Sequence, residues 1–493
     1  MNSALIIMAI FLIVTIYLGV QAKKGKDMDL EQWTVGGRGF GSIFVFLLMA
    51  GEIYTTFTFL GGSGWAYSKG GAAFYIIGYG ALMYVISYYL LPPVWKYAKK
   101  HNLMSQSDYM IKKYNSPYLG VLVAIVGVIA MIPYLITQFQ GLGLIVSEAS
   151  YGLISPTLAV WIGAISVTVY VMVSGIHGSA WTAVLKDIMI LAVCIFLGIY
   201  LPLHYYGGFE PMFKAVNAAK PGFTALQDKG LSLSWFISTV LLTSLGAYMW
   251  PHTFGASFSA KSPKVFRKNA IFMPLYQMIL MFVFLVGFAA ILQVPGLKNG
   301  DLSLLRLSEK TFDPWFIGLV GAAGLLTAIV PGSLILMTSA TMLSKNVIQV
   351  FAPKMPDQSV PKLAKYLVPI VALITVFATL KGGSALVPLL LMGYSLVTQL
   401  FPAIACSLLK RNPITKAGAA CGIIAGILVI AYTTITGTTI ASLFPSLPQT
   451  LKDLNIGVVA MVINIIVMIV ISLVTKKNMN EETIKDANKV SAG

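Results

Sequence analysis

The sequence predicts an all-α integral membrane protein with about thirteen transmembrane helices, and three observations lead to this prediction. Of the 493 residues, 57% are hydrophobic and only 10% are charged, whereas charged residues make up about a quarter of a soluble globular domain. Apolar runs of about 20 residues, enough to cross about 30 Å of hydrocarbon, recur along the whole chain. Of the 17 acidic residues, only Glu52 and Asp187 fall inside these runs.

The predicted spans follow one another with short polar connections. They cover residues 2–21, 43–67, 73–96, 119–145, 154–173, 180–202, 232–250, 270–293, 314–343, 364–380, 383–409, 415–436 and 454–475. The first apolar run has no basic region before it and no small-residue cleavage site after it, so it is predicted to be a retained helix rather than a signal peptide. The polar segment 476–493 has few apolar residues and is predicted to be a disordered tail.

Positive charge is spread over the loops. The net charge is +17, but the basic residues do not form a groove with interleaved aromatics, so nucleic-acid binding is not predicted. Placing the first loop in the cytoplasm puts most lysines and arginines on that side, which predicts an external N-terminus and a cytoplasmic C-terminus in the cell's plasma (inner) membrane. The three cysteines lie in apolar runs without CxxC-type spacing, so neither disulfides nor a zinc site is expected.

Ionisable residues inside lipid are costly and usually serve a function. Glu52, Lys186 and Asp187 lie within predicted spans, and His252 lies near a span end. Neighbouring residues on a helix point about 100° apart, so we expect that Lys186 and Asp187 do not simply pair with each other. The alternative to a functional role is that both neutralise charges on adjacent helices.

Two spans carry helix breakers near their middle or cytoplasmic end. The second contains MAGEIYTTFTFLGGSG, and the seventh contains LLTSLGAYMWPHTFG. The two breaks lie five spans apart, which inverts one relative to the other. Matched broken helices indicate a transporter site, because unwinding frees backbone groups for substrate and ion. A glycine or proline kink satisfied by neighbouring helices is the alternative for either break alone.

Several motifs resemble the sodium:solute symporter family. WTVGGRGFG at 33–41 is similar to the family signature before the first broken helix, and FTFLGGSGWAYSKG at 57–70 is similar to its Phe-Leu-Gly element. The resemblance implies a LeuT-type fold of two inverted five-helix repeats, with one helix before and two after. VLKDIMI, YMWPHT, RKNAIFMPLY and AIVPGSLILMTSATMLSKNVI look like the monocarboxylate-permease branch.

The resemblance also implies a division of the chain. Residues 1–42 form the first helix and a cytoplasmic loop, 43–410 the transporter core, 411–475 two additional helices and 476–493 the tail.

A sodium site is implied by the same resemblance. It would use backbone carbonyls of Gly51 and Tyr54 together with hydroxyls of the ninth span, where Thr327 is a candidate. This sequence departs from the pattern, because the two adjacent hydroxyl residues expected there are Val330 and Pro331. A hard cation needs several oxygen ligands, and Ser333 or Thr327 would have to replace the missing ones.

Lys186 stands where the family has a neutral residue, beside the family acid Asp187. A desolvated lysine can take up and release a proton, with Asp187 or Glu52 as the opposing charge. We therefore favour proton coupling over sodium coupling.

Candidate substrate residues flank the two breaks. They are Thr55, Thr56, Gln138, Gln140, Tyr248, Trp250, His252 and Tyr394, with Tyr394 and Gln399 as possible gate residues. Singly, such polar residues more often form interhelical hydrogen bonds, and aromatic ones more often anchor the helix at the membrane interface. Freed amides and helix dipoles at the breaks suit a small carboxylate.

The predicted function is a secondary active symporter, driven by H⁺ or Na⁺, for a small organic anion such as pyruvate, lactate, acetate or propionate. The sequence has no GxxxxGK[ST], HExxH or GxSxG motif, so neither an enzyme nor a cofactor is predicted. Membrane lipid and the solute are the expected partners, and no obligate protein partner is implied. A sodium-coupled symporter of an amino acid, vitamin or sugar remains an alternative, as does a channel or membrane sensor.

Overall fold

The computed structural model describes residues 3–22, 24, 29–51, 54–382 and 385–490, with side chains up to residue 476. Within these ranges the protein is helical, and pairing between extended segments is limited to an isolated bridge between Phe40 and Ala260. Ten of the described helical stretches are long and apolar enough to cross a membrane, or eleven if the bent pair of helices counts as one span. The all-α membrane architecture is confirmed, whereas the number thirteen stays a prediction.

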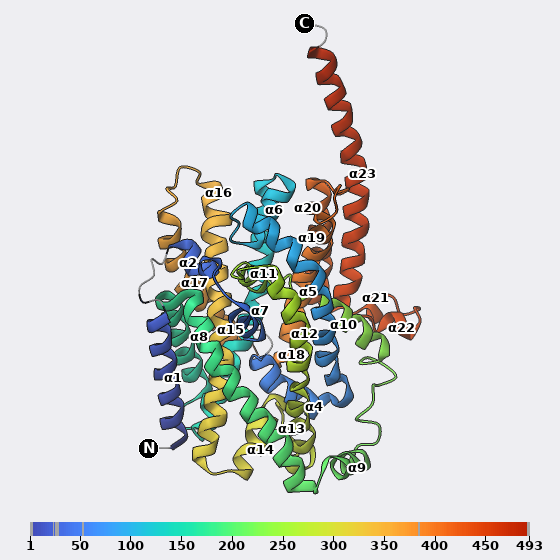
Figure 1. Ribbon diagram of the computed structural model, residues 1–493. Helices are drawn as coiled ribbons and strands as arrows, with labels where there is room; N and C mark the ends of the chain where they lie inside the picture. The colour runs from blue at the N-terminus through green and yellow to red at the C-terminus, as the bar shows by residue number, and fades with distance from the viewer. Residues whose placement is uncertain (1–2, 23, 25–28, 52–53, 383–384, 491–493) are drawn as a thin grey trace.

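The longer helices form most of the bundle (Figure 1). They are α1 (Ser3–Ala22), α5 (Tyr75–Lys100), α7 (Pro117–Ala149), α8 (Pro156–Tyr206), α12 (Lys264–Met278), α13 (Leu280–Gln293), α15 (Pro314–Thr341), α17 (Ser359–Lys381), α20 (Lys416–Thr436) and α23 (Ile456–Val490). Helix α23 continues through Val490, whereas the sequence predicts a disordered tail from residue 476. Lys and Glu, which are good helix formers, make up six of the residues 476–490, which is consistent with a helical backbone.

Two spans are broken where the glycines, prolines and polar residues predict it. The first consists of α3 (Ser42–Gly51), a π-helical turn at Phe57–Gly61 and α4 (Gly62–Lys69). The second consists of α10 (Leu233–Gly246) and α11 (Pro251–Ser257), which bend by 48° at a short break. Helices α18 (Leu386–Val397) and α19 (Phe401–Ser407) flank a single 3₁₀ turn in a third apolar stretch.

Helix α8 is interrupted by a sharp break at Gly175. A straight helix of 51 residues would be about 77 Å long, more than twice the thickness of the hydrocarbon. Gly175 has φ +54° and ψ −154°, outside the helical region, and a Cβ there would collide with Trp33. The Trp33 indole donates to the Val171 carbonyl at 3.3 Å. The tryptophan of the WTVGGRGFG motif therefore packs into the break.

Shorter helices close the two ends of the bundle (Figure 1). Helices α2 (Leu30–Val35), α6 (Gln106–Tyr114) and α16 (Gln349–Phe351) lie toward the end from which α23 projects, and α9 (Phe209–Ala219) and α14 (Ser303–Thr311) lie at the end near the N-terminus. Helices α21 (Ile440–Leu443) and α22 (Gln449–Lys452) connect α20 to α23. Helix α15 is almost entirely buried and packs against α1, α7, α8 and α17, so it forms the centre of the molecule.

Candidate functional site

The ammonium group of Lys186 lies at the first helix break. Its side chain is fully buried, and Nζ donates to the backbone carbonyl of Tyr54 at 3.2 Å. The same Nζ is 3.0 Å from Asp187 Oδ1 and 3.6 Å from the position that a Cβ would take on Gly51. A positive charge therefore occupies the space beside the backbone that the family resemblance assigns to a cation.

The expectation that Lys186 and Asp187 do not pair is wrong. Their Cβ atoms do point apart, but the flexible four-carbon stem of lysine carries Nζ round the helix to the carboxylate. Both side chains are at most 3% exposed. The two side chains thus form an ion pair inside the protein, and the Tyr54 carbonyl is a second oxygen contact of Nζ.

Tyr54 is held firmly in place from the opposite side. Its hydroxyl donates to the Tyr276 carbonyl at 2.9 Å, and the two rings pack edge to face with centroids 4.9 Å apart. This contact ties the break to α12, so the carbonyl that faces Lys186 has a fixed position. Glu52, the other predicted ionisable residue here, lies outside the described residues.

Helix α15 presents an apolar surface to the break. Val330 Cγ1 is 3.4 Å from the Cβ position of Gly51. The hydroxyl of Thr327 donates to the Gly324 carbonyl, while Ser333 donates to the Val330 carbonyl at 2.6 Å and lies 2.7 Å from Ser179 Oγ. Both hydroxyls thus donate to carbonyls of their own helix, and their role as cation ligands, which would use the oxygen lone pairs, stays a prediction.

An aromatic cavity lies between the two breaks. It measures about 30 Å³ and is lined by Met49, Tyr79, Met83, Tyr84, Tyr134, Ala247, Tyr248, Trp250, Thr253 and Tyr394. These residues come from both broken spans and from α5, α7 and α18. Every lining side chain is uncharged at neutral pH, so recognition in this cavity depends on aromatic surface and neutral hydrogen-bond donors.

Two donors in this cavity have no partner among the described residues. The Trp250 Nε1 and the Tyr84 hydroxyl are both buried and make no hydrogen bond there. Leaving such donors unpaired costs about 1–3 kcal/mol each, which a ligand with acceptor oxygens would recover. Trp250 packs against Tyr394 with ring centroids 5.2 Å apart and against Tyr134 at 4.9 Å, so its orientation is fixed.

The predicted substrate residues fall into two groups. Tyr248, Trp250 and Tyr394 line the aromatic cavity. The Thr56 hydroxyl instead lies 3.0 Å from Gln138 Oε1 and donates to the Thr137 carbonyl. Thr56 and Gln138 thus form hydrogen bonds between helices, which is the alternative to a substrate contact.

The remaining candidates are dispersed around the cavity. Thr55 is buried at the break with a hydroxyl that has no partner among the described residues. Gln140 is half-buried and is not among the described residues that line the cavity. Gln399 is bonded to Gly457 and Asn464 of α23 and so joins α23 to the core.

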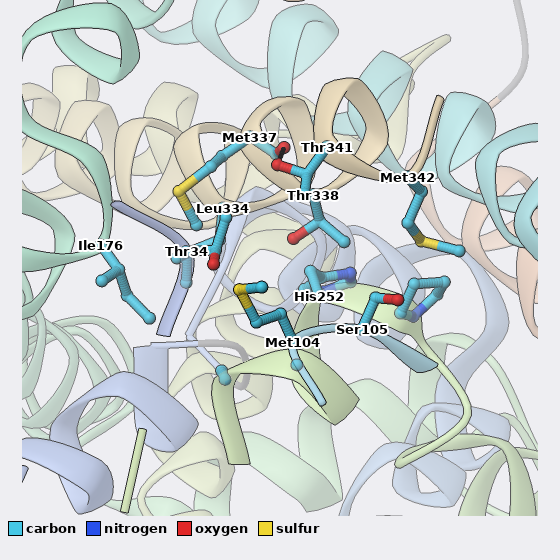
Figure 2. Close-up of a pocket in the computed structure, with 13 residues that line it drawn as sticks. Thr34, Met104, Ser105, Ile176, His252, Leu334, Met337, Thr338, Thr341 and Met342 are labelled. Carbon is cyan, nitrogen blue, oxygen red and sulfur yellow. Dashed lines mark hydrogen bonds between the residues drawn. The ribbon is translucent and has the colours of Figure 1, made fainter. Parts of the chain in front are cut away.

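His252 lines a second cavity, which lies toward α6. Figure 2 shows its ring among Ser105, Met104, Thr338 and Met342. This cavity measures about 20 Å³ and is walled by α11 and α15. His252 and Trp250 have ring centroids 5.9 Å apart, and Trp250 belongs to the aromatic cavity. The two cavities are therefore separated by this pair of rings.

Helix α6 holds the structure together at this end, a feature that the sequence analysis missed. Asp108 accepts from Lys345 Nζ at 2.7 Å and from Asn346 Nδ2 at 2.8 Å, which joins α6 to the end of α15. Burial raises the pKa of Asp108, but Lys345 and these hydrogen bonds lower it further, so the net pKa is below its ordinary value.

Gln106 of the same helix donates to the Met249 carbonyl at 2.9 Å. This bond satisfies a carbonyl freed by the second break. The only sequence signal for these contacts was the Ser105–Asp108 capping box, which predicts a helix start but gives no indication of its partners.

Comparison with known proteins gives the family. Residues 33–426 match the model of the sodium:solute symporter family. The chain is 67% identical over 479 residues to "Uncharacterized symporter YhjB" of Bacillus subtilis (strain 168), covering 97% of this chain and 98% of that protein. It is 27% identical over 371 residues to "Monocarboxylate transport permease protein" of Rhizobium johnstonii, covering 74% and 75% of the two chains.

A solved structure has the same fold. A Na⁺-coupled sialic acid symporter in a substrate-bound, outward-open state superimposes with a TM-score of 0.78 at 16% identity, covering 96% of this chain and 97% of that one. The family match spans most of the sequence, including both helix breaks, Lys186 and α15. This chain belongs to the sodium:solute symporter family and is a multi-pass secondary transporter.

Proposed function

We propose that the protein is a proton-coupled symporter of a small monocarboxylate such as pyruvate, lactate, acetate or propionate. The observation that carries the proposal is the Lys186 ammonium, 3.2 Å from the Tyr54 carbonyl at the first break. An ammonium and a sodium ion cannot occupy this space together. Deprotonation of Lys186 toward one side of the membrane, and reprotonation from the other, would replace the binding and release of sodium in the transport cycle.

The ligands around the ammonium support protons over sodium. Sodium needs several oxygen ligands, but α15 offers Val330 and Pro331 where hydroxyls would be required. Asp187 Oδ1 lies 3.0 Å from Nζ and is the opposing charge in this proposal.

The aromatic cavity supports a small carboxylate. Its volume of about 30 Å³ holds about two water molecules. Even acetate, with four heavy atoms, would need the walls to move, and a short solute would need the smallest movement. Trp250 Nε1 and the Tyr84 hydroxyl can donate to carboxylate oxygens, and the methionine and tyrosine faces suit a short alkyl group. The relative named as a monocarboxylate transport permease is consistent with this substrate class.

The orientation and the span count form part of the same proposal. We place the N-terminus outside and the C-terminus in the cytoplasm of the plasma membrane, since most basic residues lie in loops on the α6 side. Thirteen crossings follow if α3 and α4 together make one crossing and if α8 makes two, divided at Gly175. The core 43–410 would then hold the two inverted repeats, with α20 and α23 as additional helices.

Transport by purified protein in liposomes tests the proposal. An inward pyruvate or lactate gradient at equal Na⁺ should acidify the lumen, as reported by a trapped pH dye, and an imposed pH gradient should concentrate the solute. Trp250→Phe and Tyr84→Phe each remove one donor, so we expect a raised KM with little change in protein folding. Uptake that requires a sodium gradient and moves no protons would overturn proton coupling. Flux that never concentrates the solute would indicate a channel.

A further inference from the structure

A buried carboxylate lies at the end of the molecule opposite α6. Asp301 belongs to a 3₁₀ turn, Gly300–Leu302, just before α14, and is 2% exposed. Its Oδ2 accepts from the backbone N–H of Leu386, the first residue of α18, at 3.0 Å. Oδ1 lies 2.6 Å from the position a Cβ would take on Gly64 of α4. One side chain therefore contacts both α4 and α18.

Neighbouring contacts hold the turn against the same helices. Asn299 Oδ1 accepts from the Asp301 N–H at 3.0 Å, which fixes the turn itself. Ser303 Oγ donates to Ser63 Oγ of α4 at 3.4 Å. A side chain on Gly64 would collide with the Asp301 backbone, so only glycine permits this approach. The turn is thus clamped onto α4.

Helices α4 and α18 connect the Asp301 turn to residues at the aromatic cavity. Trp65 of α4 stacks on Trp235 of α10 with centroids 5.6 Å apart and packs against Tyr75 at 5.7 Å. Tyr75 is 6.0 Å from Tyr79, which lines the cavity together with Tyr394 of α18. Alternating access moves one helix bundle against the other. If α4 and α18 separate in that movement, the Asp301 bond to α18 breaks.

We infer that Asp301 is a proton-binding site of this outer gate, separate from Lys186, and that its protonation from the outside holds α4 and α18 together. The inference uses the orientation proposed above, in which α14 is extracellular, but it needs neither the proposed substrate nor the proposed coupling ion.

The electrostatics give the sign of the effect. Burial raises the pKa of Asp301 to about 6, although the Leu386 N–H partly opposes this by lowering it. In an open gate the carboxylate would be hydrated and return toward its ordinary value of 3.8. The closed gate therefore binds the proton more tightly, so acid favours closure and the ionised carboxylate favours opening. Between pH 7.5 and pH 5 the closing equilibrium should shift by about tenfold.

The other ionisable groups on adjoining elements are engaged elsewhere or exposed. Arg306 of α14 pairs with Glu148 at 2.7 Å and with Glu309 at 3.4 Å. Tyr67 of α4 donates to the Val294 carbonyl at 2.9 Å and accepts from the Leu297 N–H. The remaining groups on these segments are Lys69, Lys298 and Lys310, which are exposed, and Tyr394 of α18, which faces the aromatic cavity.

A cysteine reporter tests the inference directly. Met83→Cys lines the aromatic cavity, and the three native cysteines are replaced by serine. In right-side-out vesicles we measure how fast this cysteine reacts with a membrane-impermeant thiol reagent, and divide that rate by the rate for Lys229→Cys at an exposed position. The ratio reports the fraction of molecules whose outer gate is open. We expect this ratio to fall by about tenfold from pH 7.5 to pH 5.

Two substitutions of Asp301 should act in opposite directions. Asp301→Asn keeps the shape and an acceptor for Leu386 but removes the buried charge, so labelling should be slow at both pH values. Asp301→Ala removes the bond to α18 and opens a void, so labelling should be fast at both. Asp228→Asn, in an exposed loop on the same side, should keep the wild-type pH response.

Three results would overturn the inference. These are labelling that does not vary with pH in the wild type, an unchanged pH response in Asp301→Asn, and labelling that occurs only in inside-out vesicles. Because no solute or coupling gradient is present, a failure of proton-coupled uptake would leave this result standing, and the two proposals can fail independently.

Discussion

Removing the Lys186 charge should destabilise the protein through the carboxylate left behind. Lys186→Met keeps the approximate length and apolar stem but leaves Asp187, about 3% exposed, without its ion-pair partner. Breaking a buried ion pair by removing one partner costs about 3–5 kcal/mol. The reciprocal variant, Asp187→Asn, leaves an ammonium that still has the Tyr54 carbonyl, so its cost should be somewhat smaller.

The double variant distinguishes an ion pair from two independent effects. In Lys186→Met/Asp187→Asn neither charge of this pair remains, so the double variant should be more stable than Lys186→Met alone by at least about 1 kcal/mol. The Tm values of the wild type, the two single variants and the double variant, measured in detergent at one scan rate, give the order of their stabilities. The same four proteins in liposomes should show solute-driven proton movement only where Lys186 is present.

The opposite order would refute this reasoning. If Lys186→Met melts like the wild type, or if the two single losses simply add in the double variant, the 3.0 Å contact carries no coupling energy. If Lys186→Met still moves protons with solute, the lysine is not the coupling group. A stable Lys186→Met protein that binds solute but moves no protons supports the assignment, because folding and binding are then intact.

Three further predictions concern the cation space at Lys186, the contacts of Asp108 and the aromatic cavity. The triple variant Lys186→Ala/Val330→Ser/Pro331→Ser removes the ammonium from the cation space and supplies two hydroxyls there. Added NaCl, but not KCl, should therefore raise the Tm of this variant. A Tm that does not respond specifically to sodium would count against the idea that Lys186 takes the place of a sodium ion. Asp108→Asn should lower stability by about 2 kcal/mol at neutral pH. The pKa of Asp108 in the folded protein is below its ordinary value of 3.8. The stability difference between wild type and Asp108→Asn should therefore be complete above pH 3.8 and should vanish as the pH falls through the folded-state pKa. A stability difference that does not change with pH would contradict the ion pair with Lys345. Gly393→Ala would place a Cβ 2.6 Å from Trp250 Cη2. The substitution should push the indole into the aromatic cavity and raise the KM for the solute. Unchanged transport kinetics would show that this cavity is not the binding site.

The broken helices could be predicted because their cause is local. Helix α3 ends at Gly51 and α11 begins at Pro251, within the segments where glycine, proline and polar residues cluster. Apolar length alone predicts the membrane spans. The prediction that a lysine and an acid lie within the bilayer came from the same local information, as did the family resemblance carried by the WTVGGRGFG and FTFLGGSGWAYSKG motifs.

Contacts between distant segments could not be predicted in this way. The periodicity of one helix predicts which way a Cβ points, but not where the end of a long lysine side chain lies, so the pairing of Lys186 with Asp187 was missed. Thr56 and Gln138 were expected at a substrate, yet they lie within 3.0 Å of each other. Asp301 and Asp108 were missed because their partners lie 85 and 237 residues away.

The sequence by itself determined that this is a polytopic helical transporter with two interrupted spans, since hydrophobic length and helix breakers act within a single segment. Only the tertiary structure decided that an ammonium fills the space at the first break and that aromatic rings from α5, α7, α18 and the α10–α11 break line the cavity. It also decided that two buried carboxylates, Asp108 and Asp301, join helices at opposite ends of the molecule. Those features depend on the distances between helices, which side-chain packing sets across the whole bundle.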